Sequence, residues 1–142
     1  MCGPRAPALR GQGPAVAAVA AGGAVGSLAR WGVGLLVATP PGAFPWTTFG
    51  VNVLGSLLMG ALVVLVTEVR TAHPLVRPFL GVGVLGGFTT FSTFVVDAEL
   101  LLAGGHRVTA LLYLAGTVLA AVTAAALGMV LVHRATGRGG LP

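Results

Sequence analysis

The sequence predicts an all-α membrane protein with four transmembrane helices, and three observations support this prediction. First, 56% of the 142 residues are hydrophobic and only 8% are charged, whereas a soluble domain carries charge on roughly a quarter of its residues. Second, the apolar residues gather in four runs, each close to the ~20 residues that a membrane-spanning helix needs. Third, four spans with short loops use the whole length, which leaves no room for a separate soluble domain.

The two ends of the chain are expected to lie outside the membrane. Residues 1–13 are rich in Gly, Pro and Arg, without an apolar period, and predict a disordered cytoplasmic tail. Residues 134–142 predict a second tail, so a four-helix transmembrane domain is expected over residues 14–133. The first apolar run, 14–38, also resembles a signal peptide. It continues well past Ala20, however, and its removal would leave three spans.

Three further spans follow in order. The segment 39–45 (TPPGAFP) is a Pro-rich loop, and the second span is expected over 46–67. A polar hairpin at 68–78 leads to the third span at 79–102, and a short loop at 103–107 leads to the fourth at 108–132. The middle of the third span is unusual, because four glycines precede a cluster of hydroxyl residues, and these residue types are poor helix formers together. Since backbone opens at membrane depth only in protein or beside a polar cavity, we predict a broken third helix.

The arginines predict the orientation in the membrane. Six of the eight lie in the N-terminal tail, the 68–78 hairpin and the C-terminal tail, and only Arg107 lies in a loop on the other side. Because cytoplasmic loops carry an excess of basic residues, we expect a multi-pass protein of the plasma membrane with both termini in the cytoplasm. The same topology accounts for the pI near 11.5 better than nucleic-acid binding, for which the chain has no aromatic–basic patch.

Polar residues recur along two of the spans. Thr48, Asn52, Ser56 and Gly60 share one face of the second helix, and Thr109, Tyr113 and Thr117 share a face of the fourth. Helix packing explains Ser56, Gly60 and Thr109, and it also explains the Gly22 and Gly26 pair. The Asn52 carboxamide needs partners in hydrocarbon, and because its NH₂ group can donate to an anion, a role in a pore is favoured.

The string GGFTTFSTF at 86–94 is the most specific signal. Phe91 and Phe94 are three residues apart and would share a helix face, which in an ordinary helix indicates core packing. Here they alternate with hydroxyl residues beside a predicted break. The positive edge of an aromatic ring can face an anion, and carbonyls freed at a break can coordinate a cation.

Three strings together resemble the Fluc (CrcB) family of fluoride channels: AGGAVGSLARW at 21–31, TTFGVNVLGSLLMG at 47–60 and GVLGGFTTFSTFVVDAE at 83–99. The resemblance covers all four spans. It implies an antiparallel, dual-topology dimer with two fluoride pathways and a structural Na⁺ at its centre, held by the backbone carbonyls of Gly86 and Thr89. The fluoride pathway that the resemblance implies comprises Asn52, Phe91, Phe94, Thr48, Ser92, Thr93, Tyr113 and Thr117. The chain departs from the family pattern at Thr47, Asp97, Thr117 and Ala121, and the last of these removes a hydroxyl from the fourth-helix track.

A fluoride pathway of this kind would work without catalysis. Amide and hydroxyl donors and ring edges replace the water of a small anion without a fixed charge, so that entry and exit both stay easy. No general acid, base or nucleophile is evident, since His73, His106 and His133 lie in loops or at a span end and are expected to be interfacial. Arg30 and Asp97 lie in the outer halves of their spans; they could snorkel separately, pair with each other, or, for Arg30, attract anions into a vestibule.

The charge bias also bears on the partner. A chain that inserts in both orientations should have balanced flanking arginines, and this one does not. We therefore expect either a homodimer or a heterodimer with an oppositely oriented paralogue, surrounded by membrane lipid. Two alternatives remain open: a small multidrug-type exporter, which would need a membrane-embedded carboxylate, and a non-transporting membrane subunit. An enzyme is disfavoured, and the lone Cys2 excludes an internal disulfide.

Overall fold

The computed structural model describes residues 12–37, 39–69 and 73–137, and all regular elements within them are helical. The elements are α1 (Gly13–Leu36), α2 (Trp46–Val64), the π-helical segments η1 (Leu65–Val69) and η2 (Arg77–Leu85), α3 (Gly86–Phe88), α4 (Ser92–Ala103) and α5 (Arg107–Ala135). They make four helices that are long and apolar enough to cross a membrane: Gly13–Leu36, Trp46–Glu68, Arg77–Ala103 and Arg107–Ala135. The prediction of an all-helical protein with four possible spans is therefore confirmed. The predicted disorder of both tails falls largely on residues 1–11 and 138–142, which lie outside the described residues.

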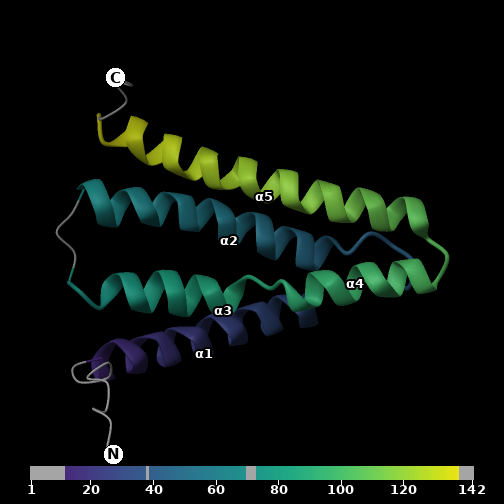
Figure 1. Ribbon diagram of the computed structural model, residues 1–142, viewed down its shortest axis with the longest axis horizontal. Coiled ribbons are helices and arrows are strands. Elements are labelled where there is room, and N and C mark those ends of the chain that lie inside the picture. The colour runs from purple at the N-terminus through teal and green to yellow at the C-terminus, as the bar shows by residue number, and fades with distance from the viewer. Residues whose placement is uncertain (1–11, 38, 70–72, 138–142) are drawn as a thin grey trace, which may run out of the picture.

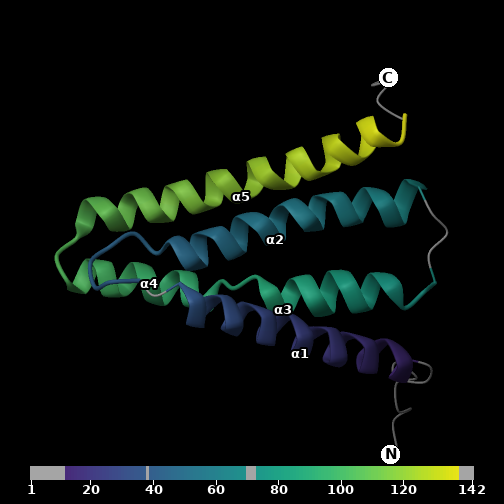
Figure 2. The ribbon, with the colours of Figure 1, turned by 180° about the vertical axis from the view of Figure 1, so that it is seen from behind.

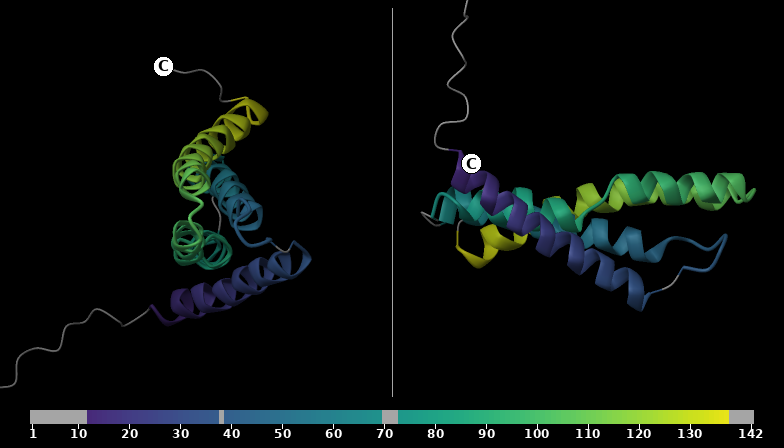
Figure 3. Two further views of the ribbon diagram at one scale, coloured as in Figure 1. Left: turned by 90° about the vertical axis from the view of Figure 1, so that its right-hand side faces the viewer. Right: turned by 90° about the horizontal axis from the view of Figure 1, so that it is seen from below.

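The spans run alternately in opposite directions (Figures 1 and 2), so that the start of α1 and the end of α5 lie at the same end of the molecule. In space α2 packs against α5, α1 packs against η2 and α3, and α4 packs against α5. The end-on view in Figure 3 shows α1 crossing the third span at an angle instead of lying parallel to it. The third span, made of η2, α3 and α4, therefore lies between α1 on one side and the α2–α5 pair on the other.

Glycines allow α1 to approach the third span closely. A Cβ atom added at Gly22 would collide with the Phe79 carbonyl, and one at Gly26 would collide with the Val84 carbonyl. A Cβ atom at Gly87 would in turn meet the Gly23 backbone. Small residues at such positions let helix backbones touch in the membrane, which is the packing role predicted for Gly22 and Gly26.

A second glycine contact joins α2 to α5. A Cβ atom at Gly60 would collide with the Ala125 carbonyl, and one at Gly128 would collide with the Leu57 carbonyl. Gly60 thus packs as the sequence predicts. Nearer the other end of the molecule, α4 and α5 enclose a core cluster of Phe94, Ala98, Leu101, Ala110 and Tyr113.

Large apolar side chains cover the outside of the molecule. Leu36, Phe91 and Val108 have exposed fractions of 86%, 77% and 72%, and many other Leu and Val side chains are similarly open. Contiguous apolar surface of this extent is typical of contact with lipid or with another protein. It agrees with a membrane protein and leaves room for a partner.

Candidate functional site

The third span is not helical between Phe88 and Ser92. Thr89 has an extended backbone (φ −73°, ψ 156°), and α4 begins only at Ser92. Figure 1 shows this interruption between α3 and α4, near the middle of the span. Gly86 and Gly87 have low helix propensity. In addition, the Thr89 hydroxyl donates to the Leu85 carbonyl at 2.9 Å, a local bond that competes with the helical pattern.

Asn52 on α2 binds the interrupted segment through both ends of its carboxamide. Its Nδ2 donates to the Thr90 carbonyl at 2.9 Å, and its Oδ1 accepts the Thr90 backbone N–H at 2.8 Å. In this structure Asn52 therefore supplies the acceptor and the donor that the backbone N–H and C=O of Thr90 would find in a continuous helix. An amide nitrogen carries two hydrogens, so one remains after the bond to Thr90.

Gly86 and Thr89 are among the residues whose backbone carbonyls lose their usual helical donors at this point. The donor to Gly86 O in a continuous helix would be the Thr90 N–H, which instead binds Asn52. The donor to Thr89 O would be the Thr93 N–H, which instead binds the Thr90 hydroxyl at 3.1 Å. Hard cations prefer oxygen ligands of this type, so Gly86 and Thr89 fit the structural Na⁺ that the family resemblance implies.

A cluster of hydroxyl groups lies at the start of α4. Thr90 Oγ1 donates to Thr93 Oγ1 at 3.0 Å and is 3.3 Å from Ser92 Oγ. Ser92 is exposed, whereas Thr90 and Thr93 are partly buried. The side chain of Thr90, which the sequence did not assign to the pathway, is thus the centre of the cluster.

The two phenylalanines take different environments. Their ring centroids are 5.8 Å apart, but Phe94 is only 6% exposed and Phe91 is 77% exposed. Phe94 packs against Tyr113, with ring centroids 5.2 Å apart. Phe94 thus belongs to the core, while Phe91 presents its ring at the surface beside the interruption.

Asp97 is held by α2 and α5. Thr48 Oγ1 donates to Asp97 Oδ2 at 2.6 Å, and Tyr113 Oη donates to the same oxygen at 3.3 Å. Both donors are buried, so the carboxylate is satisfied by neutral hydroxyls. Thr117 is also buried, and its hydroxyl donates to the Tyr113 carbonyl at 2.7 Å, within its own helix.

Arg30 and Asp97 have different partners. Arg30 Nε donates to the Gly87 carbonyl at 3.2 Å, whereas Asp97 accepts from Thr48 and Tyr113. Across residues 12–37, 39–69 and 73–137, the ion pair within 4.0 Å is His133 with Glu68. The pairing considered for Arg30 and Asp97 is therefore not found, because each residue reaches a nearer polar group.

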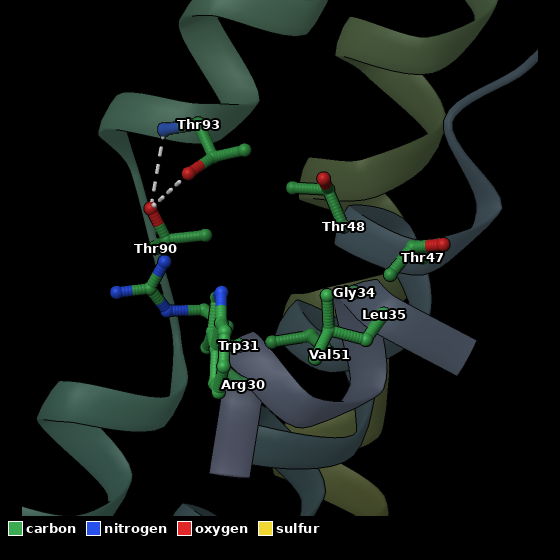
Figure 4. A pocket seen from close by; sticks show the side chains of 9 residues that line it. All are labelled: Arg30, Trp31, Gly34, Leu35, Thr47, Thr48, Val51, Thr90 and Thr93. Atoms are coloured by element: carbon green, nitrogen blue, oxygen red, sulfur yellow. Dashed lines mark hydrogen bonds between the residues drawn. The ribbon is translucent and has the colours of Figure 1, made fainter. Parts of the chain in front are cut away.

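Two hollows flank the interruption and are lined by six of the eight predicted pathway residues, whereas Ser92 and Tyr113 line neither. A cavity of about 360 Å³ holds Thr48 and Thr93 (Figure 4); its lining comprises Arg30, Trp31, Gly34, Leu35, Thr47, Thr48, Val51, Thr90 and Thr93. A more open hollow of about 250 Å³ is lined by Asn52, Thr89, Thr90, Phe91, Phe94, Thr117, Val118 and Ala121. Thr89 and Thr90 therefore belong to the backbone interruption and also line the hollows, which the residue spacing alone did not indicate.

The described part of the chain contains no group of three or more His, Cys, Asp or Glu side chains that could hold a metal. The oxygen atoms at the interruption are those of the main chain and of the Thr, Ser and Asn side chains. The fold and site together define a small multi-pass membrane protein with polar groups and open backbone gathered inside an otherwise apolar helix.

Comparison with known proteins gives the family. Residues 17–129 match the family model described as CrcB-like protein, Camphor Resistance (CrcB), and the chain belongs to this family. Similar curated proteins are named fluoride-specific ion channels. FluC 1 of Streptomyces coelicolor is 58% identical over 81% of this chain and 75% of its own length. FluC 2 of Streptomyces avermitilis is 56% identical over 80% and 75%, and FluC 2 of Thermobifida fusca is 50% identical over 88% and 96%.

Proposed function

We propose that this chain is a subunit of a fluoride-selective channel that exports fluoride from the cytoplasm and so lowers its toxicity. The observation that carries the proposal is the exposed Phe91 ring beside a hydroxyl-lined helix interruption, in a chain 58% identical to a protein named as a fluoride-specific channel. Ion channels carry out no chemical step, which agrees with the absence of catalytic groups expected from the sequence.

The polar groups near Phe91 suit a small, strongly hydrated anion. The second amide hydrogen of Asn52 can donate into the hollow that Asn52 and Phe91 line. The ring edge of Phe91 adds a positive surface without a formal charge. Because neutral donors hold an anion less tightly than a bare cation would, the ion can leave as easily as it enters.

Two polar positions contribute less directly in the single chain. The Thr117 and Thr48 hydroxyls donate to protein oxygens. In this arrangement their hydrogens are therefore not available to an anion, and the two residues only shape the wall of the pathway. Phe94, Tyr113 and Asp97 support that wall from the core. We assign the anion contacts to Asn52, Phe91, Ser92 and Thr93, and we assign a positioning role to the others.

A Na⁺ ion is proposed at the interruption. Gly86 and Thr89 offer the carbonyls that have lost their helical donors, and a cation there would compensate their partial negative charge. Its effect would be structural, namely to fix the open backbone that carries Thr90 and Phe91. Removal of Na⁺ should therefore lower fluoride flux.

The channel is proposed to need a second subunit in the opposite orientation. The exposed apolar faces of the single chain leave surface for such a partner. The arginine bias favours one orientation for this chain, so we propose an oppositely biased paralogue as partner, with self-pairing as the alternative. Streptomyces avermitilis has two related proteins with separately numbered names, so more than one such protein can occur in one organism.

Fluoride efflux from liposomes that contain this chain and Na⁺ tests the proposal, with a fluoride electrode as the readout and chloride as the control ion. We expect fluoride-selective efflux that Phe91→Ile slows about tenfold, which corresponds to roughly 1.4 kcal/mol of added barrier. The matched variant Phe94→Ile should lower thermal stability as well as flux, because Phe94 is buried and Phe91 is not.

Absence of efflux from folded protein would point first to the missing opposite-facing subunit, and the assay would be repeated with such a relative present. If fluoride efflux is still absent, or if chloride leaves equally fast, the fluoride-channel proposal is wrong.

A further inference from the structure

Arg30 on α1 lies beside the interruption in the third span. Its Nε donates to the Gly87 carbonyl at 3.2 Å, and Ser27 Oγ, also on α1, donates to the same oxygen over a longer distance of 3.5 Å. The Arg30 side chain is half-buried, and in Figure 4 it extends from α1 toward the segment that carries Thr90. A charged donor thus reaches a main-chain oxygen inside a membrane-spanning segment.

The Gly87 carbonyl needs this donor because of the interruption. In a continuous helix Gly87 O would accept the Phe91 N–H, but α3 ends at Phe88 and that bond is not formed. A main-chain carbonyl without a partner is costly away from water. α1 therefore supplies the donors that the third span cannot supply to itself, and Arg30 makes the shorter bond, at 3.2 Å against 3.5 Å for the exposed Ser27.

The packing of α1 brings Arg30 to this point. A Cβ atom at Gly26 would collide with the backbone of Val84 and Phe88, and one at Gly87 would meet Gly23. Arg30 lies four residues after Gly26, about one helical turn along the same face. The close glycine contact therefore sets the distance from which Arg30 reaches Gly87.

We infer that Arg30 is a positioning residue that holds the interruption open through its Nε donor, and not through its charge. Gly86 is the immediate neighbour of Gly87, so the bond restrains the backbone next to the carbonyl proposed for Na⁺. The consequence for Na⁺ and flux rests on the proposed function, whereas the role of Nε in holding the backbone does not. A residue that only attracted anions would need the charge and would not need Nε.

Two substitutions separate the donor from the charge. In Arg30→Gln the amide nitrogen occupies the same place along the side chain as Nε, so the donor is retained and the charge is lost. In Arg30→Met the Nε place is taken by carbon and the charge is lost as well, so Met and Gln share the loss of charge and differ in the donor. Arg107→Gln is the matched control, because Arg107 is an exposed arginine at the start of α5.

Hydrogen exchange of the backbone amides at 89–93 is the first measurement, because it does not depend on ion conduction. We expect Arg30→Met to speed this exchange about tenfold, the order expected when a buried carbonyl loses a hydrogen-bond partner. Arg30→Gln should change it far less, and Arg107→Gln should not change it. Equal exchange in Arg30→Met and Arg30→Gln, or faster exchange in Arg30→Gln, would overturn the inference.

The second measurement is the Na⁺ dependence of fluoride efflux for the same variants. We expect Arg30→Met to need about tenfold more Na⁺ than Arg30→Gln for half-maximal efflux. If Arg30→Gln loses efflux as fully as Arg30→Met, charge is the property that counts and the inference is wrong. If the wild type itself does not conduct, the proposed function fails, while the exchange result still decides the role of Arg30.

Discussion

Asn52 shows how one side chain can stabilise an open backbone. A helix interruption leaves a main-chain donor and a main-chain acceptor free, and a carboxamide carries one of each type. Asn52 satisfies the N–H and the C=O of Thr90 together. The sequence predicted that this residue would need partners in the membrane, and the partners are main-chain groups of the third span.

This leads to a prediction for Asn52→Leu. Leu has a similar size but no polar atoms, so both main-chain groups of Thr90 would lose their partners, at a cost of roughly 1–3 kcal/mol for each. We expect a lower melting temperature in detergent and loss of most fluoride flux. Leu54→Ala, at an exposed site on the same helix, is the control and should change both quantities much less.

A different result would locate the role of Asn52 elsewhere. If Asn52→Leu abolishes flux but leaves the melting temperature unchanged, the bonds to Thr90 do not stabilise the fold. Asn52 would then act on the ion alone.

At the residue scale the sequence predicted the type of site better than its contacts. Polar residues in a span must be satisfied, which identified Thr48, Asn52 and Tyr113 as important. It could not show that Thr48 and Tyr113 both donate to Asp97, because this contact joins three helices. Nor could it show that Phe91 is exposed while Phe94 is buried, since their spacing predicts one shared face only if the segment is helical.

At the scale of elements, glycine contacts place the helices. Gly22 and Gly26 allow α1 to touch the third span, while Gly60 and Gly128 join α2 to α5. The sequence predicted the positions of the four spans to within a few residues, because apolar runs and Pro-rich loops mark their ends directly. The choice of neighbours depends on contacts between distant segments, for which a single sequence gives only weak signals.

The glycine contact between α1 and the third span can be tested with Gly26→Ala. The added methyl group would collide with the Val84 carbonyl, so α1 must move away from the interruption. We expect a lower melting temperature and faster exchange at 89–93, because Arg30 would no longer reach Gly87. Both quantities should change in the same direction as in Arg30→Met.

Gly32→Ala is the matched control on the same helix. A Cβ atom at Gly32 meets no other group within 4 Å in the single chain, and Ala is the better helix former by about 1 kcal/mol. Stability should therefore stay equal or rise. Equal losses in the two variants would show that the space beside Gly26 is not the limiting feature.

At the scale of the whole molecule, the alternating direction of the four spans puts the start of α1 and the end of α5 at one end (Figure 1). The 73–77 side of the hairpin, with Arg77, lies at this end too, and Arg107 lies at the opposite end. The structure thus groups the described arginines near the span ends as the sequence predicted. Which end faces the cytoplasm follows only from the basic excess and remains a prediction.

That prediction can be tested with the protein's own thiol. Cys2 is the single cysteine of the chain and lies close to the N-terminus, so labelling of intact cells with a membrane-impermeant maleimide reports its side. We expect Cys2 to be protected in intact cells and labelled after lysis. In a Cys2→Ser, Pro41→Cys variant, whose thiol lies in the loop between α1 and α2, we expect labelling without lysis.

Comparable labelling of both sites in intact cells would mean that the chain inserts in both orientations, and a homodimer would then need no paralogue. Protection of Cys2 in nearly all molecules would instead mean that this chain inserts in one orientation only. An antiparallel channel would then need a different protein as its opposite-facing subunit.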